Sequence, residues 1–265
     1  MIRRGWFALF LAAALALALV FLALPVAAVF LDVGPARLLD SLGDRSATDA
    51  LRLSLETSAV AVAIIVLVGT PAAYLLALRR FRGRSLVVSV IELPLVLPPA
   101  VAGIALLATL GPKGLLGGAA AGAGVRLVLE TAGVVVALTF VAAPFYLRQA
   151  QEAFAALNPR MLEASRTLGA GEAATFVRAA VPAAAPGLAA GLALAWGRAL
   201  GEFGATLMFA GSLRGVTQTV PLAIYDRFAT DFTGALALSA MLVALSGALL
   251  VSVKLATGAG PRAAR

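Results

Sequence analysis

Long runs of apolar residues recur along this chain, and they constrain its fold more than any other feature. A helix needs about 20 consecutive apolar residues to cross the hydrocarbon core of a bilayer. Of the 265 residues, 62% are hydrophobic and only 13% are charged, whereas soluble domains are roughly half apolar and one quarter charged. The chain is therefore predicted to be an all-α integral membrane protein with about six spans, at residues 6–31, 51–78, 86–110, 131–149, 187–210 and 234–254.

The first run follows Arg3 and Arg4, a layout that signal peptides and first transmembrane helices share. The apolar core of a signal peptide is only about 7 to 15 residues long. This run is longer and contains Pro25, so we interpret it as a retained span; cleavage is the alternative. The third run contains Pro94, Pro98 and Pro99. Proline removes backbone hydrogen bonds from a helix, so this span is predicted to be bent or broken.

Basic residues divide unequally between the connections. With the N-terminus inside, 13 of the 21 Lys and Arg residues lie in cytoplasmic segments, 7 lie in external loops and Arg198 lies within a span. This bias predicts that both termini are cytoplasmic and that the number of spans is even. The densest basic group is residues 79–84. Membrane topology and lipid explain the net charge of +8 better than binding to nucleic acid does.

The chain lacks several chemical tools. It has no Cys and no His, which excludes disulfides, thiolate or imidazole metal sites and every catalytic arrangement built on Ser-His or Cys-His. No phosphate-binding G-x-x-x-x-G-K-[ST] loop is present, so the sequence predicts no nucleotide site of this type in the chain. An intramembrane hydrolase is disfavoured because Glu92, Glu202 and Lys254 lie on different spans without a motif. We predict no catalytic residue and no metal site.

The connection between the fourth and fifth spans is polar and patterned. Asn158-Pro159 is a helix-start signal, with Asn as N-cap and Pro at the first helical position. A short helix is expected to end at Gly169, and a second, over residues 172–181, is expected to be broken by Pro182. This pair would form a ledge suited to docking a soluble partner; the alternative is a helix pair that only lies on lipid.

Two motifs resemble a known family. Glu163-Ala164-Ser165, Gly169 and Val181-Pro182 resemble the EAA motif of the membrane subunits of bacterial ABC importers, with Ser165 in place of the usual second alanine. Residues 93–99, 199–211, 217–219 and 221–225 are similar to molybdate permease subunits. The likeness covers roughly residues 51–253. It implies the type I importer permease fold, with a first helix and external loop over 1–50, a transmembrane domain over 51–254 with its coupling segment at 158–182, and a cytoplasmic tail over 255–265.

The resemblance also implies a function. The chain would be the permease subunit of an ATP-driven molybdate importer in a bacterial plasma (inner) membrane. It would work as a homodimer with two cytoplasmic ATPase subunits, which bind ATP-Mg, and an external molybdate-binding protein. Coupling to the ATPase would use Glu163, Ala164, Ser165, Gly169 and Pro182. Sulfate, thiosulfate or tungstate are alternative cargoes. A secondary transporter is the alternative from another class, but the ledge would then have no purpose.

Polar residues of the fifth span and the following loop are candidates for the translocation path. Arg198 and Glu202 are four residues apart, so they are expected to share a helix face and to pair; the pair either faces the path or only stabilises the bundle. Glu92 is expected to satisfy backbone amides near Pro94, and a direct role in transport is the alternative. Hydroxyls and backbone amides bind tetrahedral oxyanions well, and ordinary helix packing is the competing explanation. The further candidates are Gly201, Gly204, Thr206, Thr217 and Thr219.

Overall fold

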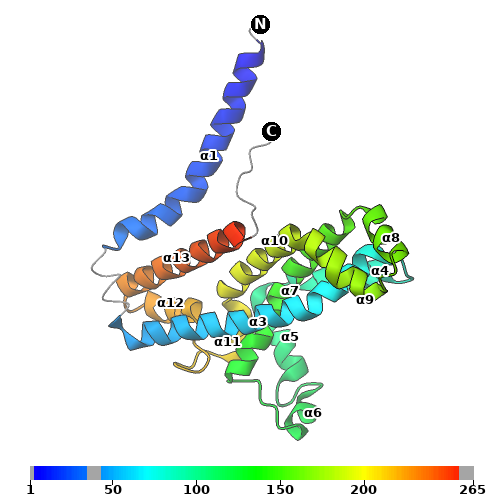
Figure 1. Ribbon diagram of the computed structural model, residues 1–265. Coiled ribbons are helices and arrows are strands. Elements are labelled where there is room, and N and C mark those ends of the chain that lie inside the picture. Colours follow the sequence, from blue (N-terminus) through cyan, green and yellow to red (C-terminus); the bar gives the residue numbers. More distant parts are fainter. Residues whose placement is uncertain (1–2, 35–42, 257–265) are drawn as a thin grey trace.

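The computed structural model describes residues 3–34 and 43–256, and the regular structure in these ranges is helical (Figure 1). The last residues of the predicted tail, 257–265, lie outside the described part, as do residues 35–42 of the predicted first loop. In chain order the elements are α1 (Arg3–Asp32), α3 (Arg45–Leu78), α4 (Arg84–Val96), α5 (Pro99–Leu110), α6 (Gly117–Gly122), α7 (Thr131–Ala155), α8 (Pro159–Thr167), α9 (Glu172–Thr175), the π-helical turn η1 (Phe176–Ala180), α10 (Val181–Leu200), α11 (Gly204–Ala210), α12 (Val220–Phe228) and α13 (Phe232–Ala256).

The predicted third span is broken, as its prolines indicated. Five helical segments of the described residues are long and apolar enough to cross a membrane alone, and α4 with α5 forms a sixth candidate that is bent by 118°. The bend falls at Leu97 and Pro98, both in extended conformation. Pro98 and Pro99 cannot donate backbone hydrogen bonds, and a residue before proline avoids the helical region. Pro94, by contrast, lies inside α4.

Three helices form the core of the bundle. α3 and α7 pack along one another, and α10 contacts both. Their crossing centres on buried Tyr146, whose hydroxyl lies 2.6 Å from the Thr70 hydroxyl. Two glycines let the backbones of α3 and α10 approach this ring. A Cβ atom at Gly69 would lie 3.0 Å from Tyr146 Cδ1, and one at Gly191 would lie 3.3 Å from Tyr146 Cδ2.

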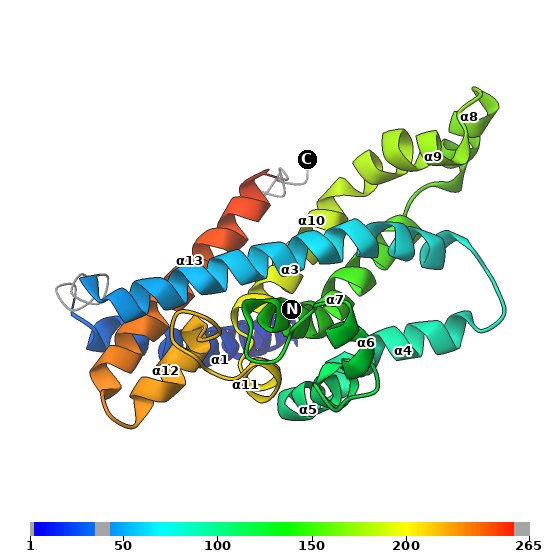
Figure 2. The ribbon, with the colours of Figure 1, turned by 90° about the horizontal axis from the view of Figure 1, so that it is seen from below.

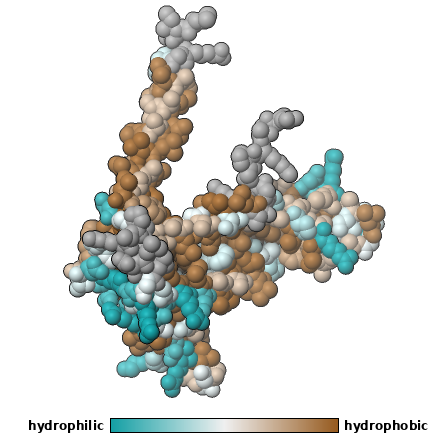
Figure 3. Space-filling view, turned by 60° about the vertical axis from the view of Figure 1, so that its left-hand side comes forward, coloured by the Kyte–Doolittle hydropathy of each residue, from teal (hydrophilic) through white to brown (hydrophobic). Residues whose placement is uncertain are grey.

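α1 leaves this core. In Figure 1 it projects away from the bundle, and its packing partner is α13. Its membrane-spanning window is 0% buried, and the apolar surface of α1 is visible in Figure 3. Such a surface is stable only against lipid or another apolar surface.

The fifth span differs from its prediction at both ends. The expected single span over 187–210 is divided, because α10 ends at Leu200 and α11 begins at Gly204. The predicted break at Pro182 is wrong: the chain continues from α9 through η1 into α10, with Pro182 in the first turn of α10. The π-helical turn places a wider backbone spacing directly before Pro182, where proline has no amide to donate. The connection before α13, expected as a loop, contains α12, which has Pro221 in its first turn.

Candidate functional site

The predicted coupling segment forms two short helices at one end of the bundle. α8, α9 and the turn between α3 and α4 lie at this end in both Figure 1 and Figure 2. We call it the coupling end. The predicted N-cap of α8 is confirmed, because Asn158 Oδ1 accepts a hydrogen bond of 3.0 Å from the Arg160 amide. Pro159 occupies the first turn, where a missing amide costs nothing.

Gly169 makes the turn between the two helices. Its φ is +88°, a conformation in which side chains other than glycine's are strained. The Ala170 amide donates to the Ser165 carbonyl at 3.1 Å, as at a helix end closed by a left-handed residue. The sequence interpretation of Gly169 as the residue of a tight turn is confirmed.

The outer face of α8 carries most of the predicted coupling residues. Glu163, Ala164 and Gly169 are exposed, as is Pro182 beyond the turn. Leu168 is 87% exposed, whereas Leu162, on the same helix, is 5% exposed and anchors α8 in the core. Ser165 is half-buried, and its hydroxyl lies 3.2 Å from the hydroxyl of buried Thr175. The serine that departs from the usual motif therefore joins α8 to α9.

Glu172 is a charged residue of this segment that the sequence analysis did not single out. Its carboxylate lies 3.0 Å from Arg79 Nη2, at the end of α3, and 3.6 Å from Arg166 Nη2, on α8. Only its position in the first turn of α9 distinguishes it in the sequence, since acidic residues favour that position. Glu172 thus connects the ledge to the end of a membrane-spanning helix that is distant in sequence.

The predicted pairing of Arg198 and Glu202 is confirmed, but its setting differs from the expected mid-helix position. Arg198 is in the last turn of α10, and Glu202 follows the helix end. Arg198 Nη2 lies 2.6 Å from Glu202 Oε2, with the two side chains 26% and 1% exposed. Oε2 accepts no well-aligned hydrogen bond from the described residues. Oε1 accepts a hydrogen bond of 2.7 Å from the Ala205 amide. The same carboxylate therefore contacts Arg198 in the last turn of α10 and a backbone amide in the first turn of α11.

The break between α10 and α11 lies against the break between α4 and α5. A Cβ atom at Gly204 would lie 2.8 Å from Pro99 Cβ, and one at Gly103 would lie 2.6 Å from the Ala205 carbonyl oxygen. These glycines let α5 and α11 pack at backbone distance. Phe203, within the break between α10 and α11, also packs against Tyr225 of α12, with ring centroids 5.1 Å apart and the rings tilted by 49°.

The threonine candidates are buried. Thr206, in α11, and Thr219, before α12, have hydroxyls with no hydrogen-bond partner among residues 3–34 and 43–256. The Thr217 hydroxyl accepts a hydrogen bond of 2.8 Å from the Leu213 amide. Gly201 is exposed and lines a groove of about 580 Å³ between α10 and α13. Their role in a path stays a prediction.

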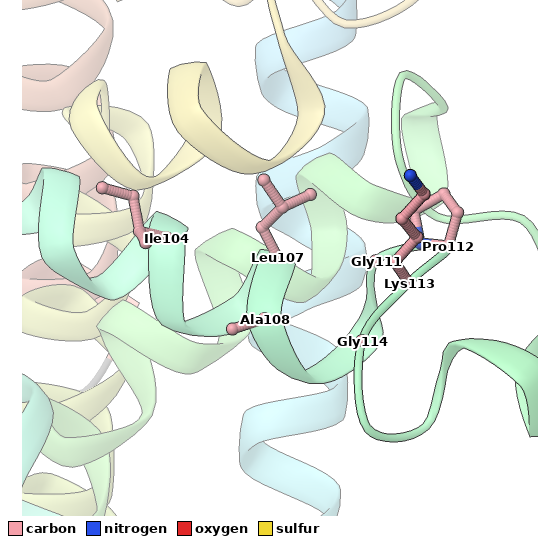
Figure 4. A pocket seen from close by; sticks show the side chains of 7 residues that line it. All are labelled: Ile104, Leu107, Ala108, Gly111, Pro112, Lys113 and Gly114. Carbon is pink, nitrogen blue, oxygen red and sulfur yellow. The ribbon is translucent and has the colours of Figure 1, made fainter.

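The expectation that Glu92 serves nearby backbone amides is wrong: its carboxylate lies 4.0 Å from Arg148 Nη1 on α7, and Arg148 Nε lies 3.5 Å from Glu152. The helix passes Pro94 unbroken, so few free amides are available there. At the opposite end of the bundle, an apolar pocket of about 470 Å³ lies beside Lys113 (Figure 4).

Known proteins are similar to this chain in sequence and in fold. Residues 66–258 match the family described as "Binding-protein-dependent transport system inner membrane component". The molybdenum transport system permease protein ModB of Mycobacterium tuberculosis is 40% identical over 242 residues, which are 91% of this chain and 92% of that protein. The sulfate transport system permease protein CysW of Synechocystis is 32% identical over 249 residues, covering 93% and 90%.

A solved structure extends the comparison to the fold. A chain of a bacterial alginate ABC transporter, crystallised with its alginate-bound periplasmic protein, superposes with a TM-score of 0.74 at 17% identity, covering 96% of this chain and 94% of its own length. The broken spans and the paired helices at the coupling end thus occur in a fold of the type I ABC importer permeases. With most of its length matched, the chain belongs to the family of inner membrane components of binding-protein-dependent transport systems.

Proposed function

We propose that this chain is the membrane-spanning permease subunit of an ATP-driven importer that carries molybdate into the cytoplasm. The observation that carries the cargo is its 40% identity to a molybdenum permease over 91% of the chain. A sulfate importer is the second candidate, supported by the 32% identity to a sulfate permease. Tungstate has nearly the size and charge of molybdate and would be carried by the same site.

In the proposed assembly, two copies of this chain share one path in a bacterial inner membrane. Two ATPase subunits bind ATP-Mg and dock on the outer face of α8, and an external binding protein delivers the anion at the opposite end. Exposed Leu168 and Glu163 offer an apolar and a charged contact to the ATPase. The basic turn of residues 79–84 at the coupling end favours a cytoplasmic location for that end and for both termini.

The ledge would act as a lever. Closure of the ATPase pair pushes on residues 163–169, and α7 and α10 carry the displacement because both continue from the ledge into the core. The flexible points are the two helix breaks that meet at Gly204 and Pro99. Movement there would switch the path between two openings. The coupling residues in this proposal are Glu163, Ala164, Ser165, Gly169 and Pro182.

The path would bind the anion weakly through neutral groups. Glu202 lies against Arg198 and cancels most of its charge, so this pair sets the local field rather than capturing the cargo. The hydroxyls of Thr206, Thr217 and Thr219, with amides near Gly201 and Gly204, are the proposed contacts once the breaks move. Weak contact suits a subunit that must release its cargo.

The test is ATP hydrolysis by the assembled importer. The chain is reconstituted in proteoliposomes with its candidate ATPase and binding protein, and hydrolysis is measured with the binding protein loaded with molybdate or with sulfate. Stimulation by the molybdate-loaded form alone is the expected result. Stimulation by the sulfate-loaded form alone replaces the cargo and keeps the class. Failure to assemble with any ATPase overturns the proposal in favour of a secondary transporter.

A further inference from the structure

The turn between α3 and α4 concentrates positive charge at the coupling end. Arginine occupies four of the six positions 79–84. Gly83, with φ at +84° and open space around it, lets the chain reverse direction just before α4 begins. The turn is therefore short, and its four arginines lie within six consecutive residues.

Only half of these arginines have partners within the described residues. Arg79 holds Glu172, and Arg84 Nε donates to the Leu76 carbonyl at 2.8 Å. Arg80 and Arg82 are exposed, and neither has an ion pair or a side-chain hydrogen bond with residues 3–34 or 43–256. A guanidinium group is a planar fork of donors that matches the oxygens of a phosphate, and the short turn carries two such groups without partners, on either side of Phe81.

The surroundings of this fork are apolar. Phe81, between the two arginines, is 41% exposed, and on the first turn of α4 Leu86 and Val87 are 70% and 40% exposed. Apolar side chains next to basic residues at the end of a span suit the boundary between headgroups and acyl chains, where the bilayer covers the apolar groups and anionic headgroups attract the basic ones. A soluble protein would need a matching apolar surface to cover these side chains, whereas a bilayer covers them without one.

We propose that Arg80, Phe81 and Arg82 form a binding site for an anionic phospholipid, with the phosphate between the two guanidinium groups and an acyl chain along Leu86 and Val87. The leaflet is the one facing the ATPase, which rests on the orientation in the proposed function. The site also adjoins the lever, because the neighbouring Arg79 is the residue that holds Glu172 of the ledge. Lipid occupancy would therefore order the turn that supports the ledge.

The test measures lipid binding directly. The purified chain, in detergent with added phosphatidylglycerol or phosphatidylcholine, is examined by native mass spectrometry, alone and with its ATPase. The variant is Arg80→Gln/Arg82→Gln, and the matched control is Arg45→Gln/Arg126→Gln, which removes two exposed arginines at the opposite end. Each arginine near an anionic surface contributes a factor of about five, so the variant should bind phosphatidylglycerol about 25-fold more weakly. The control should bind it like the wild type, and inorganic phosphate should not compete.

Two results would overturn the inference. One is equal phosphatidylglycerol binding by the variant and the wild type. The other is weaker ATPase binding by the variant in phosphatidylcholine alone with lipid binding unchanged, which would assign the arginines to the ATPase. Lipid binding by the purified chain needs no cargo. If the wild-type chain binds phosphatidylglycerol but molybdate does not stimulate ATP hydrolysis, the proposed function is contradicted and the lipid site is retained.

Discussion

At the scale of single residues, the carboxylate of Glu202 combines two tasks that depend on its charge and its shape. It pairs with Arg198 and caps the Ala205 amide. Removal of one partner from a buried pair leaves an uncompensated charge, which costs about 3 to 5 kcal/mol. We predict that Arg198→Ala lowers the melting temperature of the purified chain strongly. Addition of Glu202→Gln, which keeps the acceptor and removes the charge, should recover part of the loss.

The measurement is a double-mutant cycle by thermal unfolding in detergent. Additive losses for Arg198→Ala and Glu202→Gln would show that the two side chains act separately. The cycle also separates stability from transport, because a pair that serves the path should alter molybdate-stimulated ATP hydrolysis even where the melting temperature is restored.

Gly169 permits a second test at this scale. Its φ of +88° makes Gly169→Val strained by about 1 to 2 kcal/mol, whereas Gly169→Asn should be milder because asparagine tolerates this region. Gly171, two residues later, has φ at −66° and open space, so Gly171→Ala is the matched control. We expect Gly169→Val alone to reduce cargo-stimulated ATP hydrolysis. Equal activity in all three variants would exclude a requirement for this turn.

Asp44 gives a pH-dependent prediction. The hydrogen bond from Arg227, with that from the Ser46 amide, holds the pKa of this carboxyl below its ordinary value. The pair therefore stabilises the fold fully above about pH 4, near the unfolded pKa, and the contribution disappears as pH falls through the lower folded pKa. Melting temperatures of wild type and Asp44→Asn should differ at pH 7 and converge once the pH lies below the folded pKa of Asp44. A constant difference would refute the assignment.

At the scale of elements, the ledge is joined to the bundle by ion pairs as well as by the chain. Glu172 of α9 contacts Arg79 of α3 and Arg166 of α8. Exposed ion pairs contribute only about 0 to 1 kcal/mol to stability. We therefore expect these pairs to matter because they hold the ledge in a fixed position against α3. We predict that Arg79→Glu and Glu172→Arg each reduce the molybdate transported per ATP hydrolysed, and that the double exchange restores it.

The control for this exchange is Arg178→Glu, in the same segment, because Arg178 has no ion-pair partner among the residues that the structure describes. It should leave the transport ratio near that of the wild type. A double exchange no better than the sum of the single changes would mean that the ledge does not act through α3.

The helices themselves were largely predictable, and their breaks only in part. Apolar length predicted five spanning helices and the bent pair of α4 and α5, although the bounds of the fifth span were wrong, and Asn158-Pro159 predicted the start of α8, because these signals are local. The end of α10 at Leu200 was missed, because the apolar run continues past it. The break depends on the Glu202 carboxylate, which caps the start of α11 at the Ala205 amide. The contact of Glu92 with Arg148 and the role of Glu172 were missed because both depend on residues distant in sequence.

At the scale of the whole molecule, polar features separate into two ends. The coupling end holds the basic turn and the ledge, and the opposite end holds Lys113, the Asp44–Arg227 pair and α12. α4 with α5 carries the chain from the basic turn to the connection before α7, which ends at the ledge. We propose that the bent pair acts as one crossing, in which case six crossings would leave both termini on one side of the membrane.

The orientation of these two ends follows from the excess of basic residues at the coupling end, which should face the cytoplasm. The chain has no cysteine, so single cysteines report position without background. Leu168 of the ledge and Leu115 near Lys113 are 87% and 89% exposed, and Leu168→Cys and Leu115→Cys form a matched pair. A membrane-impermeant maleimide should label Leu115→Cys in intact spheroplasts and Leu168→Cys only after permeabilisation, while the cysteine-free chain stays unlabelled. The reverse pattern would place the ledge outside and remove it from any cytoplasmic ATPase.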